Sequence, residues 1–321
     1  MILNSVIIEL TLSKCERANL FMKHQILLYY KYIEIENPVH EMREQRRMCE
    51  KLGLTGRIIL ASEGINGTVE GKTSNTEKYI EEMSKDPRFS DIHWKKSEGT
   101  GEAFPKLSIR VREEIVSMHL HENDLKPWSV TGKYLTPYEL HSWFEKEEEF
   151  YIVDMRNDYE HKSGYFEGSI LPPLTNYRDL PKILPQLESL KNKKVLTVCT
   201  GGVRCEKASG FLISNGFSDV YQLQGGIVSY MEKYPNEHFK GKLYVFDQRI
   251  LMGFNTTDSK HEVIGICEKC NEKSEHYINC DTVGCHRHFI LCENCINEFG
   301  QICPNGCTYL RKSQRENPVH S

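Results

Sequence analysis

The first 120 residues alternate between short apolar runs and segments with the period of a helix. Runs rich in β-branched and aromatic side chains predict strands at residues 26–35, 57–61, 68–69, 93–94 and 107–111. The glycine-rich residues 63–67 predict a tight turn just before the third strand. This part of the chain is therefore expected to form a sheet.

Two segments between these runs predict helices. Asn37 and Pro38 indicate the start of the first, because asparagine caps helices and proline fits the first helical position. Gly53 indicates its end, and residues 76–84 form the second helix. The order strand, helix, strand, strand, helix, strand is that of the ferredoxin-like, or split βαβ, fold.

The middle of the chain has a different pattern. Buried apolar runs predict strands at residues 151–154, 194–198 and 220–223, with helical segments between and after them. Strands that alternate with helices are typical of a parallel sheet, which binds ligands at the carboxyl ends of its strands. Asp154 and Cys199 are both expected at that edge.

These patterns predict a multidomain chain of the α/β and α+β classes. We expect an N-terminal extension over residues 1–23 and a ferredoxin-like, acylphosphatase-like domain over residues 24–120. A parallel α/β domain is expected over residues 121–240. A linker over residues 241–262 would then lead to a small cysteine-rich segment over residues 263–321.

Composition excludes several classes of protein. Of the 321 residues 39% are hydrophobic, which is too much apolar material for a disordered chain. A net charge of −4 argues against a basic nucleic-acid coat protein, although it permits local basic patches. The sequence has no run of ~18 apolar residues, so we expect neither a membrane-spanning helix nor a membrane partner.

The chain has twelve cysteines, and eight of them crowd into the last 55 residues. No export signal is recognisable in the first 24 residues, so we expect a cytoplasmic protein with clustered cysteines that bind metal. Eight thiolates suffice for two tetrahedral zinc sites, and the C-x2-C pairs have zinc-knuckle spacing. The candidate ligands are Cys267, Cys270, Cys280, Cys285, Cys292, Cys295, Cys303 and Cys307. His276, His286 and His288 are alternative ligands, and a reduced or redox-labile tail is the alternative interpretation.

Residues 199–204, Cys-Thr-Gly-Gly-Val-Arg, carry the strongest chemical signal and lie between a predicted buried strand and a helix. The glycines let successive backbone N–H groups face one point, and such a nest stabilises an anion. A cysteine at its base is nucleophilic as a thiolate. Cys199 is therefore the candidate nucleophile, with a structural cysteine as the alternative. The expected anion-binding residues are Thr200, Gly201, Gly202, Val203 and Arg204.

This loop resembles the Cys-x-x-Gly-x-Arg active loop of rhodanese domains. Residues 154–160 and 164–170 are similar to the Asp-x-Arg…Glu and Gly-His…Gly-Ala-Ile motifs of that family, with Tyr165 and Ser169 in place of the usual His and Ala. The middle domain is therefore expected to have the rhodanese fold. Four residues separate the loop's cysteine from its arginine, one fewer than in phosphatases of this fold. The loop length thus favours sulfur or another small group over phosphate.

The resemblance extends to one rhodanese subfamily, the bacterial oxygen-dependent tRNA uridine(34) hydroxylases. Matching segments follow in the same order at residues 61–69, 106–116, 199–209, 277–280 and 292–295. The resemblance implies an oxidoreductase that places a hydroxyl group at C5 of uridine 34, with molecular oxygen as co-substrate. The tRNA anticodon loop is then the expected partner, since a loop base can be splayed into a pocket.

The expected chemistry depends on Cys199, because the sequence contains no recognisable flavin, haem or nicotinamide motif and does not identify an electron donor. The Cys199 thiolate, or its persulfide, would add to C6 of uracil and make C5 nucleophilic toward an oxygen species. Two other functions stay open. One is a sulfurtransferase that carries a persulfide on Cys199, and the other is a non-catalytic RNA- or protein-binding adaptor with a zinc tail.

Further residues are expected to support this site. Asp154 and Arg156 belong to the Asp-x-Arg motif beside the loop. Cys205 lies six positions after Cys199 and could resolve a persulfide or sulfenate as a disulfide, or could be a small buried residue.

Two basic groups are candidates for contacts with RNA phosphates. Arg110 and Arg112 share one face of a predicted strand, where the alternative is a solvated face paired with nearby glutamates. Lys207 belongs to a second basic group expected around the active loop, together with Lys191, Lys193, Lys194 and Arg204.

Overall fold

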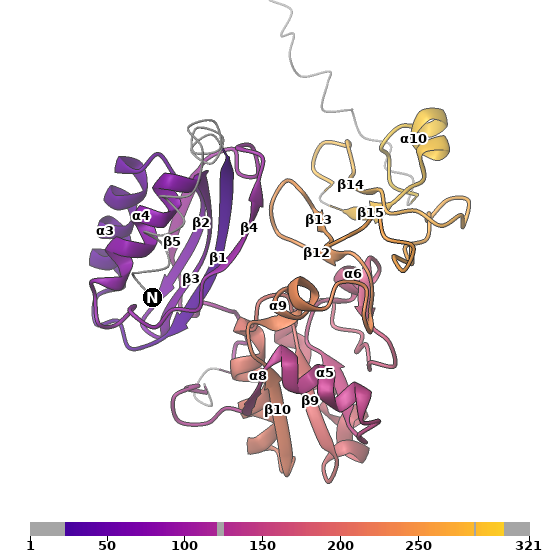
Figure 1. Cartoon of the computed structure of the whole chain (residues 1–321), viewed down its shortest axis with the longest axis horizontal. Coiled ribbons are helices and arrows are strands. Elements are labelled where there is room, and N and C mark those ends of the chain that lie inside the picture. The colour runs from indigo at the N-terminus through magenta and orange to yellow at the C-terminus, as the bar shows by residue number, and fades with distance from the viewer. Residues whose placement is uncertain (1–22, 121–124, 286, 305–321) are drawn as a thin grey trace, which may run out of the picture. The chain divides into compact units, whose positions relative to one another are not determined.

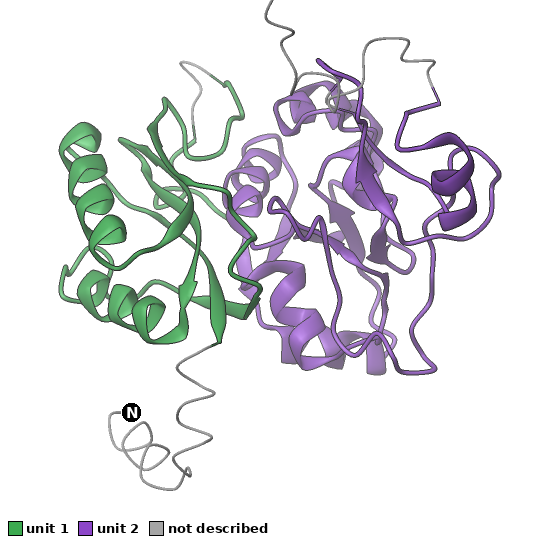
Figure 2. Cartoon of the chain, turned by 90° about the horizontal axis from the view of Figure 1, so that it is seen from above, with its two compact units in different colours: residues 1–131 green, residues 132–321 purple. Residues whose placement is uncertain are grey.

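The computed structural model describes residues 23–120, 125–285 and 287–304 (Figure 1). The chain divides into two compact units, residues 1–131 and residues 132–321, which are coloured separately in Figure 2. None of the described helices has the length and apolar composition needed to cross a bilayer.

Unit 1 contains a mixed sheet with two helices on one face (Figure 1). Its elements are β1 (His24–Tyr32), α3 (Pro38–Lys51), β2 (Thr55–Ala61), β3 (Gly64–Lys72), α4 (Thr73–Ser84), β4 (Lys95–Gly99) and β5 (Leu107–Val111). The sheet order among the described residues is β4-β1-β3-β2-β5, with β5 parallel to β2 and the other pairs antiparallel. The first four strands have the ferredoxin-like order, which confirms the predicted fold class of this part.

The start of α3 follows from local chemistry. The Asn37 side chain accepts a hydrogen bond from the His40 backbone N–H at 2.9 Å, and Pro38 occupies the first helical position. Its buried face, with Cys49 at 0% exposure, packs onto the sheet through the same cluster as Leu27, Ile58 and other strand residues.

The predicted turn before the third strand is present, but it lies at residues 62–63 instead of 63–67, because β3 already begins at Gly64. A Cβ on Gly64 would lie 2.1 Å from the Lys31 carbonyl oxygen, and a Cβ on Gly67 would lie 2.4 Å from the Tyr29 ring. The lack of a side chain at these glycines therefore allows the neighbouring strand to approach closely. The strand predicted at residues 93–94 is also displaced, to β4, which begins at Lys95. Trp94, just before it, packs its ring against Tyr29 with ring centroids 4.6 Å apart.

Unit 2 contains a parallel sheet of order β6-β10-β9-β7 within its described residues. Its first elements are β6 (Lys133–Leu135), α5 (Pro137–Glu145), β7 (Tyr151–Asp154), α6 (Asp158–His161), β8 (Gly164–Phe166), a short α7 (Leu180–Ile183) between two 3-10 turns, β9 (Lys194–Val198), α8 (Val203–Ser214), β10 (Asp219–Leu223) and α9 (Gly226–Lys233). The predicted parallel sheet is confirmed. Strand β6 was not predicted, since it has only three residues.

The remaining elements of unit 2 are small. They are β11 (Phe239–Gly241), β12 (Leu243–Tyr244), β13 (Leu251–Met252), β14 (Tyr277–Asn279), β15 (His288–Ile290) and α10 (Glu293–Phe299). Tyr277 donates a hydrogen bond from its hydroxyl to the Tyr159 carbonyl oxygen at 2.8 Å, and its ring is buried against Tyr244. The cysteine-rich segment thereby packs on α6, next to the carboxyl edge of the sheet.

Candidate active site

Cys199 follows the last residue of β9 and begins the active loop. Asp154 ends the neighbouring strand β7 and pairs in register with Val198, so both predicted residues lie at the carboxyl edge as expected. The Gly202 backbone N–H donates to the Cys199 sulfur at 3.2 Å. Gly202 has a φ of +101°, a left-handed conformation that suits glycine, and α8 begins directly after it.

A second glycine, Gly226, lets the start of α9 pack directly against the active loop. A Cβ on Gly226 would lie 2.6 Å from backbone atoms of the loop. The Ile227 and Val228 N–H groups donate to the carbonyls of Cys199 and Thr200 at 2.9 and 3.1 Å. These bonds hold two loop carbonyls against the start of α9, while the Gly202 N–H of the same loop faces the sulfur.

The environment of Cys199 favours the thiolate. Burial by itself raises the pKa of this thiol, but a hydrogen bond with the Cys205 thiol, the charge of Arg204 and the backbone N–H groups of both residues outweigh it. Together they lower the pKa of Cys199 to about 6. The residue is fully buried, so a substrate must enter the loop to reach the sulfur.

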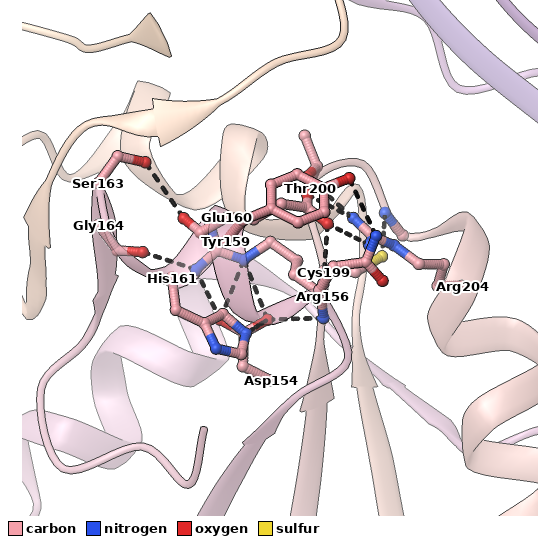
Figure 3. A network of polar contacts seen from close by, with 12 residues as sticks. Asp154, Arg156, Tyr159, Glu160, His161, Ser163, Gly164, Cys199, Thr200 and Arg204 are labelled. Carbon is pink, nitrogen blue, oxygen red and sulfur yellow. Dashed lines mark hydrogen bonds and ion pairs between the residues drawn. The ribbon is translucent and has the colours of Figure 1, made fainter. Parts of the chain in front are cut away.

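Arg204 is held by a carboxylate that the sequence reasoning did not select. Its two terminal nitrogens donate to the two Glu160 carboxylate oxygens at 2.6 and 2.9 Å, and one also reaches the Thr200 hydroxyl at 3.3 Å (Figure 3). Glu160 is fully buried and also accepts from the Asn157 N–H at the start of α6. A buried, bidentate pair of this kind fixes the guanidinium beside the active loop.

Asp154 and Arg156 form a second buried pair, next to the first (Figure 3). Arg156 donates to both Asp154 oxygens at 2.7 to 3.0 Å and to the Gly164 carbonyl at 2.7 Å. Burial alone would raise the pKa of Asp154, but Arg156 and His161 outweigh it and hold that pKa well below its usual range. This pair joins the end of β7 to the first residue of β8 and supports the edge on which the loop sits.

Cys205 lies in the first turn of α8 and is fully buried. Burial and the neighbouring Cys199 raise the pKa of its thiol well above the usual value. Cys205 therefore stays protonated and can donate its S–H to the Cys199 thiolate.

The residues expected to contact RNA are distributed differently. Arg110 and Arg112 are exposed on and just after β5 of unit 1. Lys207 is completely buried in α8, so the prediction that it contacts phosphates from an exposed surface is not supported. Almost every residue in the first two turns of α8 is buried. The presence of a lysine in the sequence does not reveal this burial.

Two other members of the second basic group, Lys193 and Lys194, lie away from the loop. Lys194 starts β9, whereas Cys199 follows its end, and a strand advances about 3.3 Å per residue. Lys193 and Lys194 form ion pairs with Glu149 and Glu148 at 2.8 and 2.6 Å. The expectation that these lysines surround the active loop is therefore wrong.

The described tail cysteines form two groups of sulfur atoms. In each group all the sulfur atoms lie within 4.8 Å of one another, and the groups are Cys267, Cys270, Cys292 and Cys295, and Cys280, Cys285 and Cys303. A tetrahedral zinc ion with Zn–S bonds of about 2.3 Å needs sulfur atoms roughly 3.8 Å apart. The Cys270–Cys292 and Cys285–Cys303 distances are 3.5 and 4.0 Å. Each group of sulfur atoms fits a zinc ion. Along the chain, pairs of cysteines of the first group alternate with cysteines of the second.

Two of the candidate ligands, Cys307 and His286, lie outside the described residues. The other two histidines have different partners. The His276 imidazole lies 3.5 Å from the Glu293 carboxylate, and His288 bonds the Tyr244 hydroxyl. The cysteine groups are thus the metal-binding candidates among the described residues.

Comparison with known proteins assigns the parts of the chain. Residues 24–115 match the family described as UPF0176 acylphosphatase like domain, residues 136–233 the Rhodanese-like domain, and residues 240–308 the family described as Rhodanase C-terminal. A solved rhodanese-like domain protein from Staphylococcus aureus is 32% identical over 30% of this chain and 90% of its own, with a TM-score of 0.27.

Two curated relatives match nearly the whole chain. The tRNA uridine(34) hydroxylase of Bacillus cytotoxicus is 43% identical over 300 residues, which is 92% of this chain and 88% of the relative. The protein of the same name from Cytophaga hutchinsonii is 42% identical over 88% of this chain and 89% of its own. The resemblance inferred from the sequence motifs is confirmed, and the chain belongs to the tRNA uridine(34) hydroxylase family.

Proposed function

We propose that the protein hydroxylates uridine 34 of tRNA at C5, with molecular oxygen as co-substrate and Cys199 as the reacting residue. The observation that carries this proposal is the buried Cys199 sulfur in a loop of backbone donors, with its pKa lowered to about 6. Relatives that match about 90% of this chain are named tRNA uridine(34) hydroxylase, which supports uridine 34 of tRNA as the substrate. Because tRNA is its substrate, the enzyme acts in the cytoplasm.

The reaction begins when the Cys199 thiolate forms a bond with C6 of the uracil and leaves an electron pair at C5. Dioxygen, reduced by two electrons to the peroxide level, is the oxidant. C5 forms a bond to one peroxide oxygen while the O–O bond breaks and hydroxide leaves. Loss of the C5 proton and of the thiolate from C6 then restores the ring double bond. Uridine, dioxygen, two electrons and two protons give 5-hydroxyuridine and water, so a two-electron reductant is a required co-reactant.

The site's own residues prepare this chemistry. The loop N–H groups and Arg204 keep the sulfur anionic before addition and after elimination. The Glu160 carboxylate fixes Arg204, and the Asp154–Arg156 pair fixes the end of β7, which leads into α6 and Glu160. We assign positioning roles to Glu160, Asp154 and Arg156 and keep the nucleophilic role for Cys199.

Two further assignments complete the proposal. The two cysteine groups each hold one zinc ion, with Cys307 as the fourth ligand of the second group. Such ions would tie the short elements of the tail together, since the described tail has few strands and one short helix. Arg110 and Arg112 of unit 1 contact tRNA phosphates and add affinity that falls with salt.

The experiment that tests the function is nucleoside mass spectrometry of tRNA from cells with and without the gene. Cells grown under dioxygen labelled with heavy oxygen should contain heavy 5-hydroxyuridine only when the gene is present. Unlabelled 5-hydroxyuridine under the same gas would show that the hydroxyl comes from water. An unchanged amount of the nucleoside without the gene would refute the function.

A sulfurtransferase is the second candidate, because residues 136–233 match rhodanese-like domains and the four-residue loop suits a persulfide. This function predicts that thiosulfate adds one sulfur atom to Cys199 and that cells without the gene lose a thiolated nucleoside. Loss of 5-hydroxyuridine alone would decide for the hydroxylase.

A further inference from the structure

One exposed aromatic ring stands beside the active loop. Phe246 lies at the tip of the β12–β13 hairpin and is 48% exposed. Its ring centre is 6.0 Å from the guanidinium carbon of Arg204, which itself is only 7% exposed. The chemistry proposed for Cys199 does not use this ring.

The ring is supported from behind by other aromatic side chains. Tyr244 packs edge-on against Phe246 with ring centroids 5.3 Å apart, and against Tyr159 of α6 at the same distance. Tyr244 is 3% exposed and packs with the buried Tyr277 of the tail. Phe246 is therefore the exposed end of a cluster whose other rings are buried or partly buried.

The hairpin tip itself is closed by internal hydrogen bonds. The Val245 N–H donates to the Ile250 carbonyl at 2.8 Å. Arg249 donates to both oxygens of the Asp247 carboxylate, at 2.8 and 2.7 Å, and the Asp247 side chain is 3% exposed. These contacts leave the loop little freedom to fold the ring away from solvent.

We propose that Phe246 stacks on the uracil ring of uridine 34 while that base is held at Cys199. The inference rests on the proposed function, which requires a flat pyrimidine to reach the loop that carries Arg204. Splayed RNA bases stack on aromatic side chains, and an adjacent cation strengthens such a platform. Stacking tolerates any base, so Phe246 supplies affinity and orientation, and the choice of uridine falls to other contacts.

A binding assay with two synthetic RNAs tests this proposal without requiring turnover. One anticodon stem-loop carries uridine at position 34, and the other carries an abasic nucleotide there. Full-length protein should bind the uridine form roughly 5- to 150-fold more tightly, the range expected for one stacked base. Phe246→Ala should remove this preference, while its affinity for the abasic RNA should equal that of the wild type.

Three variants separate stacking from other roles. Phe246→Tyr and Phe246→Trp should keep the preference, and Phe246→Leu should lose it, since leucine preserves apolar packing but cannot stack. Phe299→Ala removes another exposed phenylalanine, on α10, and serves as the matched control that keeps the preference.

The outcomes distinguish this inference from the function on which it rests. A preference that survives in Phe246→Ala, or in Phe246→Leu, would overturn the stacking role, and so would equal wild-type affinity for the two RNAs. If such a result came with gene-dependent 5-hydroxyuridine in cells, only the role of Phe246 would fall. If the nucleoside does not depend on the gene, the function itself fails.

Discussion

Replacement of Arg204 is the sharpest perturbation of the active-site electrostatics. The Arg204 charge is one of the groups that lower the Cys199 pKa to about 6. An opposite charge at close range shifts a pKa by about 1–3 units, so Arg204→Gln should raise the Cys199 pKa to roughly 7–9. At pH 7 the thiolate share would then fall from about nine tenths to about one tenth for a shift of two units.

The assay is the pH profile of iodoacetamide alkylation, with the Cys199 peptide followed by mass spectrometry. The midpoint of the profile is the quantity to compare, because it reports the pKa, whereas the absolute rate also depends on how easily iodoacetamide reaches the buried sulfur. The rate at one pH is a poorer measure, since a thiolate of higher pKa is also more nucleophilic and partly offsets its lower population.

A paired variant controls for the carboxylate that Arg204 leaves behind. Arg204→Gln alone buries an uncompensated Glu160, which costs about 3–5 kcal/mol of folding stability. Arg204→Gln combined with Glu160→Gln leaves two neutral side chains, and its midpoint should still lie above that of the wild type. Glu160→Gln alone keeps the cation and should leave the midpoint near 6 or lower. Midpoints that coincide in the wild type and both Arg204 variants would refute this account of the thiolate.

Three other predictions follow from the proposed roles. Replacing both Arg110 and Arg112 by Ala should weaken tRNA binding in a gel-shift series and reduce the slope of log affinity against log salt concentration by about two units. Binding equal to that of the wild type at every salt concentration would show that the two arginines form a solvated face. Cys270→Ser should reduce bound zinc from two ions to about one per chain in elemental analysis, and an undiminished zinc content would exclude Cys270 as a ligand. The pKa of Cys199 is about 6 in the folded protein and about 8.5 in the unfolded chain. The thiolate should therefore add about 3 kcal/mol to the free energy of unfolding above about pH 8.5, and this contribution should disappear as the pH falls to about 6. In urea unfolding, Cys199→Ser should lack this pH-dependent part, and parallel curves for the two proteins would contradict it.

The sequence allowed the regular elements to be predicted where each has a strong local signal. The strands at residues 107–111 and 194–198 have the predicted bounds, because each is an apolar run with clear ends. Strand β6 has three residues and exists through pairing with β10, which its own sequence does not encode. The glycines of β3 indicate a turn by type, although the partner strand requires them for close approach.

The active loop could be predicted because its parts are contiguous, whereas its supports are distant in sequence. Glu160 pairs with Arg204 across 44 positions, and this depends on β7 and β9 being neighbours in the sheet. The grouping of the tail cysteines likewise depends on which pairs meet in space. Lys207 shows the converse case, a charged side chain whose burial follows from the position of its helix.

The most direct test of the central claim compares Cys199→Ser with the wild type in cells that lack the chromosomal gene. The account predicts that wild-type protein restores 5-hydroxyuridine at position 34 of tRNA. The serine variant, at equal abundance and with an unchanged fold by circular dichroism, should restore none, because a hydroxyl group is not an anion near neutral pH. Restoration of the modified nucleoside by the serine variant would contradict the assignment of the chemistry to Cys199.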